Sequence, residues 1–407
     1  MASVLADFEG WRVQPGSPVP EALAALRALT AQTNVDPIVL GVTPVARSNP
    51  FQSLLYREFF RQGIAVAPVT DPMTFSGLSS ISDVEGVRVG IHLHWLSFVL
   101  SGAQDLAEAR KAVREFGDLL DAFRSKGGMV VWTVHNVLPH DATYVDEEIA
   151  LRNMVAASAT AIHVMSEATL AAVDGTVRLD PNRVIVAPHP SYVGAYPDFA
   201  TRDDARLALG IEPDELVYVM FGAIKPYKGL DALLDAFDVV QRRSQRRVRL
   251  VVAGQPDQSP SAQRFVDRCR VHPFVLIRPS KVPAEHVQYY LRAADVGIAP
   301  YERVLNSGAT VLYTTFGLPS VVPAVGALRA SLPPNAHVAF DHPTKLPDAL
   351  LEAASLTTSR AADELRSYAE HHGSGVVSGA FARDLRSFLL EKGERSIVVD
   401  RTTVPRA

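Results

Sequence analysis

Two lysines and two glycines lie within a short segment, residues 222–229, between an apolar stretch and a leucine-rich helical pattern. This order predicts a loop that joins a strand to a helix. In a parallel sheet such a loop lies at the carboxyl end of its strand, where backbone amides at the start of the next helix attract an anion. Gly222 and Gly229 would let the backbone approach that anion, and Lys225 and Lys228 would add positive charge. The pattern is typical of a phosphate-binding loop, and on these residues alone an ordinary connection with solvated lysines is an equal alternative.

A second polar loop follows a predicted strand further along the chain. Asn306, Ser307 and Gly308 stand directly before a helical pattern, so their amides are predicted to lie at a helix start that also attracts an anion. A simple helix cap or turn is the alternative. Because this loop and the lysine loop are both predicted at the carboxyl ends of strands in one sheet, we expect them to converge, which favours ligand binding.

Histidines follow two predicted strands in the first half of the chain. His92 and His94 are two residues apart on a strand and therefore share one side of it. A metal pair is disfavoured because no third ligand lies at an obvious spacing, and we expect His92 to be a hydrogen-bonded core residue. His135 ends the next strand and can accept a proton from a hydroxyl near neutral pH, while Asp141 could orient or replace it; His140 is a lesser candidate. The alternative is that His135 only holds its loop through backbone hydrogen bonds.

Composition limits the class of protein. The chain has 407 residues, 47% of them hydrophobic and 21% charged, which predicts a soluble globular protein with two domains. A net charge of -4 without a long basic run argues against nucleic acid as the main partner. The single cysteine, Cys269, excludes an intrachain disulfide and a cysteine-based zinc site and favours a reducing compartment. No signal peptide or membrane-spanning apolar run is evident, so we expect a cytoplasmic protein, with peripheral contact at the inner face of a membrane left open.

Strands and helices alternate along both halves of the chain, which predicts an α/β protein with two doubly wound parallel sheets. Turn-forming residues cluster near residue 194, where the periodicity stops. We therefore expect a Rossmann-like domain at residues 1–194, a second at residues 195–375, and a helix at residues 376–407 that returns to the first. Arg47, in the loop after the first strand, is a further ligand candidate.

The lysine loop resembles a motif of a known enzyme family. FGAIKPYKG is similar to the Gly-Arg-x-x-x-x-Lys-Gly loop of GT-B glycosyltransferases, in which a C-terminal Rossmann-like domain binds a sugar nucleotide. Gly222, Lys228 and Gly229 match the motif. Ala223 stands where the family usually has arginine, so Lys225 is the candidate for the missing charge.

The resemblance extends over residues 38–323 as an ordered series of motifs. The His-x-His run implies that His94 faces the reacting sugar and its phosphate, and the loop that begins at His135 resembles that of bacterial exopolysaccharide glycosyltransferases. Many retaining GT-B enzymes carry two glutamates, whose positions are Val304 and Leu312 here. The segment instead resembles a bacterial group that includes inverting β-mannosyltransferases, and Glu302 becomes the candidate contact to the nucleotide ribose.

The resemblance thus implies a two-domain GT-B glycosyltransferase of bacterial polysaccharide biosynthesis. It would move a hexose from a GDP- or UDP-linked donor to a hydroxyl of a sugar or glycolipid acceptor, with no cofactor and no metal. The lysines and the amides at Ser307 and Gly308 would neutralise the diphosphate. If the enzyme inverts, His94, His135 or Asp141 would deprotonate the acceptor. A GT-B-like epimerase or phosphorylase and a catalytically silent nucleotide-sugar binding protein are the alternatives.

Overall fold

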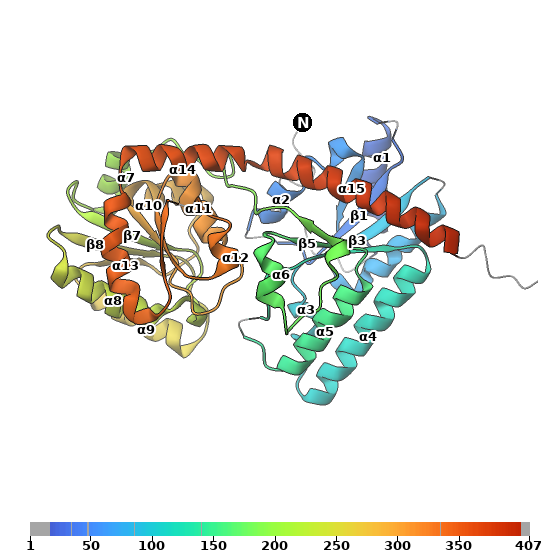
Figure 1. Cartoon of the computed structure of the whole chain (residues 1–407), viewed down its shortest axis with the longest axis horizontal. Coiled ribbons are helices and arrows are strands. Elements are labelled where there is room, and N and C mark those ends of the chain that lie inside the picture. Colours follow the sequence, from blue (N-terminus) through green and yellow to red (C-terminus); the bar gives the residue numbers. More distant parts are fainter. Residues whose placement is uncertain are drawn as a thin grey trace, which may run out of the picture. The chain divides into compact units, whose positions relative to one another are not determined.

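The computed structural model describes residues 17–33, 35–46, 49–84, 86–139, 141–333 and 335–399. The chain divides into two compact units, an N-terminal unit, Met1–Pro188 with Ser374–Ala407, and a C-terminal unit, His189–Gly373. Each unit contains a six-stranded parallel sheet with helices on both faces (Figure 1). The predicted α/β fold with two doubly wound sheets is therefore confirmed.

The N-terminal sheet has the strand order β2-β1-β3-β4-β5-β6. Its strands read as continuous apolar runs because helices cover both faces. The strands are β1 Ile38–Thr43, β2 Ile64–Pro68, β3 Arg88–Leu93, β4 Met129–Thr133, β5 Ala161–Val164 and β6 Val184–Val186. The helices are α1 Val19–Thr30, α2 Phe51–Leu55, α3 Ser97–Leu100, α4 Leu106–Ser125, α5 Val145–Ser158, α6 Ala168–Val173 and α15 Ser374–Val399.

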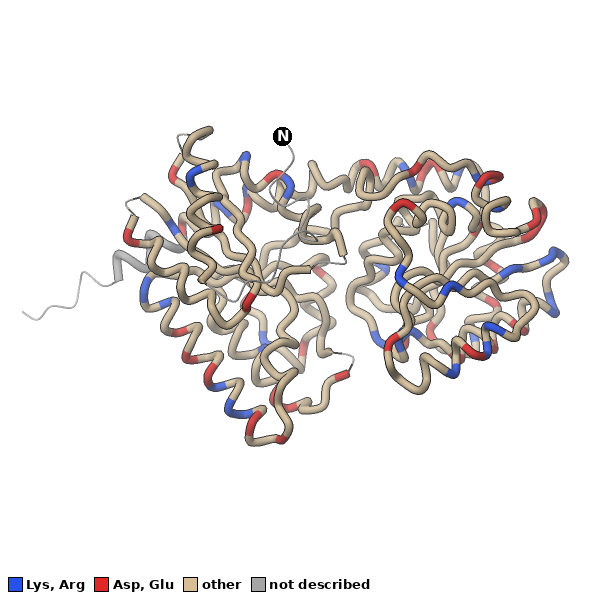
Figure 2. The backbone as a smooth tube through the Cα atoms, turned by 180° about the vertical axis from the view of Figure 1, so that it is seen from behind, with Lys and Arg blue, Asp and Glu red and all other residues tan. Residues whose placement is uncertain are grey.

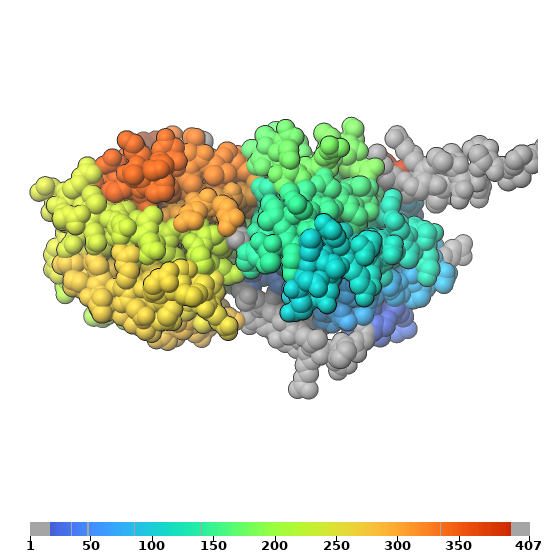
Figure 3. Space-filling view, turned by 90° about the horizontal axis from the view of Figure 1, so that it is seen from below, coloured from blue at the N-terminus to red at the C-terminus, as the bar shows by residue number. Residues whose placement is uncertain are grey.

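Helices α4 and α5 cover one face of this sheet, and their cyan and green surface is seen in Figure 3. Acidic and basic residues are interspersed along α4 (Figure 2), as expected for a helix with one solvated side. Helix α15, the last along the chain, packs on the N-terminal unit, where Phe381, Leu385 and Leu389 are buried in one hydrophobic cluster with residues of the sheet. The described residues contain no helix long and apolar enough to cross a membrane.

The C-terminal sheet has the strand order β12-β11-β10-β7-β8-β9. The strands are β7 Leu216–Phe221, β8 Val248–Ala253, β9 Val275–Arg278, β10 Val296–Ile298, β11 Ser320–Pro323 and β12 His337–Phe340. The helices are α7 Arg202–Leu209, α8 Leu230–Arg243, α9 Pro260–Val271, α10 Val287–Ala293, α11 Gly308–Phe316, α12 Gly326–Arg329, α13 Leu346–Ala353 and α14 Ser359–His371. Short 3-10 turns in the two units are η2 Phe60–Gln62, η3 Pro72–Asp83, η4 Pro181–Arg183, η5 Pro226–Lys228, η6 Ala284–His286, η7 Pro343–Lys345 and η8 Ala354–Leu356.

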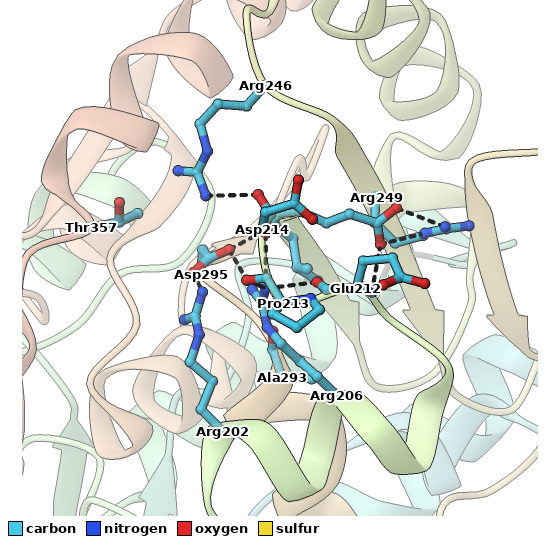
Figure 4. Close-up of polar contacts among 12 residues, drawn as sticks. Arg202, Arg206, Glu212, Pro213, Asp214, Arg246, Arg249, Ala293, Asp295 and Thr357 are labelled. Atoms are coloured by element: carbon cyan, nitrogen blue, oxygen red, sulfur yellow. Dashed lines mark hydrogen bonds and ion pairs between the residues drawn. The ribbon is translucent and has the colours of Figure 1, made fainter.

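A buried ion-pair network holds α7 at the amino ends of β7 and β10 (Figure 4). Arg206 is 2% exposed, and its guanidinium donates to Asp295 Oδ2 at 2.9 Å and to several backbone carbonyls. Asp295 also pairs with Arg202 at 2.6 Å and accepts from the backbone amide of Val217 at 2.8 Å. Carbonyl and carboxylate oxygens satisfy the buried guanidinium of Arg206. The network thereby ties α7 to the amino ends of β7 and β10, opposite to the loops that carry the candidate site.

Candidate active site

The two polar loops predicted to converge lie against each other in the C-terminal unit. They follow β7 and β10, which are neighbouring parallel strands. The backbone amide of Glu302 donates to the carbonyl of Tyr227 at 2.9 Å, so the loops are directly hydrogen-bonded. A Cβ atom at Gly229 would lie 2.1 Å from the carbonyl oxygen of Pro300, and Gly229 has a φ of +65°. Only glycine therefore permits this approach of the two backbones.

Lys228 ends the 3-10 turn η5 and is buried, with 6% of its surface exposed. Its Nζ lies 5.6 Å from the centre of the Tyr301 ring and 3.4 Å from the place where a Cβ on Gly222 would stand. In the described part of the chain, no carboxylate lies within ion-pair distance of this Nζ. Burial, and next the charge of Lys225, lower the pKa of Lys228 to about 8. The loop thus holds a buried cation whose charge no acidic side chain offsets, and an anion bound there would stabilise it.

The start of α11 lies beside this lysine. Ser307 is buried, and its Oγ accepts from the backbone amide of Thr310 at 3.3 Å, which makes it the N-cap of the helix. The Tyr301 hydroxyl lies 3.1 Å from Ser307 Oγ, so Tyr301 contacts both the helix start and the lysine. The next residue, Gly308, is close to Tyr192, whose hydroxyl would be 2.7 Å from an added Cβ. The helix start and Lys228 therefore offer amides and a cation at adjacent points of one unit.

Tyr313 fixes the position of α11 against the two strands. Its hydroxyl accepts from the backbone amide of Phe221 at 2.9 Å and donates to the carbonyl of Ile298 at 3.1 Å, which ties the ends of β7 and β10 together. Gly297 leaves the room for this ring, because a Cβ there would lie 2.3 Å from it. Sequence reasoning missed Tyr192, Tyr301 and Tyr313, although each lies within or beside a motif that it singled out.

The other candidates of the C-terminal unit are less enclosed. Lys225 and Glu302 are exposed, and Asn306 is half-buried. Lys225 is near enough to Lys228 to help lower its pKa, so its charge acts on the same place. Glu302 contributes its backbone amide to the loop contact, and its role toward a ribose stays a prediction.

The N-terminal unit brings two of the predicted catalytic residues together. His94 Nδ1 lies 2.9 Å from His135 Nε2. His94 is 1% exposed, whereas His135 is half-buried and stacks on Trp95 with ring centres 4.3 Å apart. Burial, and next the neighbouring histidines, hold the pKa of His94 well below its ordinary value. His94 is therefore neutral near pH 7. A neutral imidazole donates a hydrogen bond from one ring nitrogen and accepts one at the other, and each nitrogen of His94 has one partner.

His92 is the hydrogen-bonded core residue that the sequence predicts. It is fully buried, its Nδ1 lies 2.6 Å from the Tyr56 hydroxyl and its Nε2 lies 2.7 Å from Thr133 Oγ1. The rings of His92 and His94 stack with centres 4.4 Å apart, which confirms that they share one side of the strand. Among the described residues, no group of three or more histidine, cysteine, aspartate or glutamate side chains is arranged to hold a metal ion.

Asp141 is not joined to the histidine pair. Its side chain is exposed in a turn after β4, and in the described part of the structure no hydrogen bond or ion pair links it to His94 or His135. Two further sequence candidates, Arg47 and His140, lie outside the described residues. The C-terminal unit thus contains a buried cation with helix amides, and the N-terminal unit contains a hydrogen-bonded imidazole pair. The first arrangement can bind an anion and the second can accept a proton.

Comparison with known proteins shows that this chain is similar to glycosyltransferases. Residues 215–355 match the family model described as glycosyl transferases group 1, a range that contains every candidate residue of the C-terminal unit. A GDP-mannose:glycolipid 4-beta-D-mannosyltransferase of Xanthomonas campestris is 26% identical over 287 residues, which are 69% of this chain and 71% of that protein. A D-inositol 3-phosphate glycosyltransferase of Segniliparus rotundus is 31% identical over 157 residues, 38% of this chain and 34% of that protein.

Two solved structures share the fold. Sucrose-phosphate synthase from Thermosynechococcus elongatus aligns with a TM-score of 0.62 at 14% identity, over 90% of this chain and 100% of that one. HepE from Anabaena, solved in complex with UDP, aligns with a TM-score of 0.60 at 15% identity, over 86% of this chain and 100% of that one. The two six-stranded parallel sheets are those of the GT-B fold. The matched family model and the mannosyltransferase relative support a glycosyltransferase of this fold, as the motifs predict.

Proposed function

We propose that this glycosyltransferase moves a hexose from a nucleoside diphosphate sugar to a hydroxyl of a sugar or glycolipid acceptor, without a divalent metal. The observation that carries the proposal is Lys228, a buried cation with no acidic partner in the described part of the chain, beside the start of α11. A diphosphate supplies the charge that this place lacks. The mannosyltransferase relative, whose donor is GDP-mannose and whose acceptor is a glycolipid, supports this substrate class and favours GDP over UDP.

In the proposed reaction the acceptor oxygen bonds to the anomeric carbon of the donor sugar. The bond from that carbon to the phosphate oxygen breaks, and its electron pair leaves with the diphosphate, where Lys228 and the helix amides offset the charge. The proton of the acceptor hydroxyl passes to His135, which is half-buried and held by His94. Such a base acts directly on the acceptor, so we propose inversion at the anomeric carbon. With a lipid-linked acceptor, the reaction would take place at the inner face of the membrane.

The test is a screen of the purified protein against a panel of nucleotide sugars, with and without glycosyl acceptors. Mass spectrometry identifies the products and the nucleotide that is released. Release of GDP together with a glycosylated acceptor supports the proposal. An epimerised donor formed without acceptor, a sugar phosphate formed with inorganic phosphate, or nucleotide binding with no turnover would each replace it by one of the alternative functions. A run with EDTA decides whether the reaction needs a divalent metal.

A further inference from the structure

A continuous row of hydrogen bonds crosses the N-terminal unit from half-buried His135 to a backbone carbonyl. We call it the histidine row, and it consists of His135, His94, Tyr56, His92, Thr133, His163 and the carbonyl of Ala187. In order, the links are His135 Nε2 to His94 Nδ1 at 2.9 Å, His94 Nε2 to Tyr56 OH at 2.6 Å, Tyr56 OH to His92 Nδ1 at 2.6 Å, His92 Nε2 to Thr133 Oγ1 at 2.7 Å, Thr133 Oγ1 to His163 Nδ1 at 3.0 Å, and His163 Nε2 to Ala187 O at 2.9 Å.

The carbonyl at the inner end sets the direction of the row. A carbonyl oxygen only accepts, so His163 Nε2 must carry a proton and donate it to Ala187. A neutral imidazole has one donor and one acceptor, which makes His163 Nδ1 the acceptor for the Thr133 hydroxyl. That hydroxyl has a single proton, and its oxygen therefore accepts from His92 Nε2. Each link determines the next.

The same reasoning continues to the outer end. His92 Nδ1 accepts from the Tyr56 hydroxyl, whose oxygen accepts from His94 Nε2. His94 Nδ1 then accepts from His135 Nε2. With neutral imidazoles, the row has one proton arrangement that satisfies every link, and in it each histidine carries its proton on Nε2. The acceptor nitrogen of His135 is consequently Nδ1.

We propose that Tyr56, His92, Thr133 and His163 are positioning residues that hold His135 in its Nε2–H tautomer and so make Nδ1 the atom that takes the acceptor proton. This inference rests on the proposed function, in which His135 is the base. A base in the wrong tautomer presents a donor to the substrate hydroxyl where an acceptor is needed, and in a serine protease the corresponding error lowers kcat about ten-thousandfold.

The histidine row fixes the tautomer of His135 and does not carry the proton of the acceptor hydroxyl into the buried part of the unit. If the protons shifted along the row after His135 received one, the positive charge would move to a buried imidazole. His92, His163 and Thr133 are fully buried, and the Phe381 ring of α15 stacks on His163 with ring centres 4.3 Å apart. Burial already holds the pKa values of His92 and His94 well below the ordinary value. The charge therefore stays on His135, the half-buried end of the row, until the proton is released.

The direct test is NMR of the full chain with ¹⁵N-labelled histidine rings at about pH 8.5, where an ordinary histidine is neutral. Long-range ¹H–¹⁵N correlations distinguish Nε2–H from Nδ1–H rings, and loss of a signal in each His→Gln variant assigns it. We expect Nε2–H for His92, His94, His135 and His163. An Nδ1–H ring or a charged ring at any of the four positions overturns the proposal. The spectrum needs no substrate. It therefore tests the tautomers separately from the question of whether the protein transfers a sugar.

The kinetic test is Tyr56→Phe, which removes the hydroxyl between His92 and His94 and keeps the ring. We expect kcat to fall at least tenfold with KM for the donor unchanged, and the His94 and His135 signals to show mixed tautomers. The matched control is Tyr218→Phe in the C-terminal unit, which loses an equally buried hydroxyl bonded to Leu350 O at 2.9 Å and is expected to keep kcat. A kcat equal to that of wild type in Tyr56→Phe, or a fall with all tautomers retained, overturns the proposal. If the variant does not fold, the wild-type spectrum alone decides.

Discussion

Replacing Lys228 by methionine is expected to stabilise the fold and weaken nucleotide binding at the same time. Burial lowers the pKa of Lys228 from 10.5 to about 8. At about 1.36 kcal/mol per pKa unit, keeping this side chain charged in the folded protein costs roughly 3 kcal/mol. Methionine removes that cost, and it also removes the contact with the Tyr301 ring, which is worth about 0.5 to 2 kcal/mol. The free energy of unfolding should therefore rise by about 1 to 3 kcal/mol at pH 7.

The pH dependence of the free energy of unfolding shows whether burial of the Lys228 charge opposes folding. Because the folded pKa of Lys228 is lower than the unfolded one, the unfolded chain binds more protons between about pH 8 and pH 10.5. The stability of wild type relative to Lys228→Met consequently rises through that interval and is constant below it. Denaturation by urea, measured for both proteins from pH 7 to pH 10, tests the difference. Groups that titrate in both proteins cancel in the comparison.

Binding changes in the opposite direction. Loss of one charge-assisted contact to a diphosphate is worth about 1.5 to 3 kcal/mol, or roughly a ten- to hundredfold increase in the Kd for GDP or UDP. In wild type the affinity should fall above about pH 8, by up to tenfold per pH unit, as free Lys228 loses its proton. Calorimetry on both proteins measures this. A variant that is less stable than wild type and binds nucleotide equally well would refute the reasoning and make Lys228 a structural residue.

Three further outcomes are expected. Gly229→Ala should destabilise the C-terminal unit by several kcal/mol and abolish nucleotide binding, because its Cβ would lie 2.1 Å from a backbone oxygen. The control is Gly326→Ala, whose Cβ would meet nothing within 4 Å and which should change neither the Kd for nucleotide nor the free energy of unfolding measured with urea. Arg206→Met leaves Asp295 without its buried partner and should cost about 3 to 5 kcal/mol in the free energy of unfolding, and unchanged stability would show that the network in Figure 4 does not hold the fold. Activity should persist in EDTA, and complete loss that magnesium or manganese restores would contradict a metal-independent reaction.

Much of the fold could be predicted from the sequence because apolar strands and amphipathic helices alternate with clear periods. The lysine loop and the start of α11 were predictable for a related reason, since glycine and helix-cap residues mark loops whose place in a parallel sheet is known. The direction in which single side chains point could not be predicted. Asp141 and Glu302 lie in the expected loops, yet both are exposed, and sequence does not say which way a loop residue points.

The histidine row could not be read from the sequence because it depends on strand register. Thr133 of β4 is paired directly with His163 of β5, and that pairing is fixed only when the sheet forms. Tyr56 comes from a different element again, the end of helix α2, and no local pattern links it to His92 or His94. Alternation along β3 did indicate that the two histidines share a side, which is a property of neighbours two residues apart.

The central claim, that the C-terminal unit binds the donor diphosphate and the N-terminal unit provides the base, is tested most directly by measuring nucleotide affinity and kcat side by side. The proteins are wild type, Lys228→Met and His135→Ala, with circular dichroism as the control for folding. We expect Lys228→Met to lose nucleotide affinity, and His135→Ala to bind nucleotide like wild type while its kcat falls about a hundred- to ten-thousandfold. A folded His135→Ala protein with wild-type kcat, or one that loses affinity as much as Lys228→Met does, would contradict the claim.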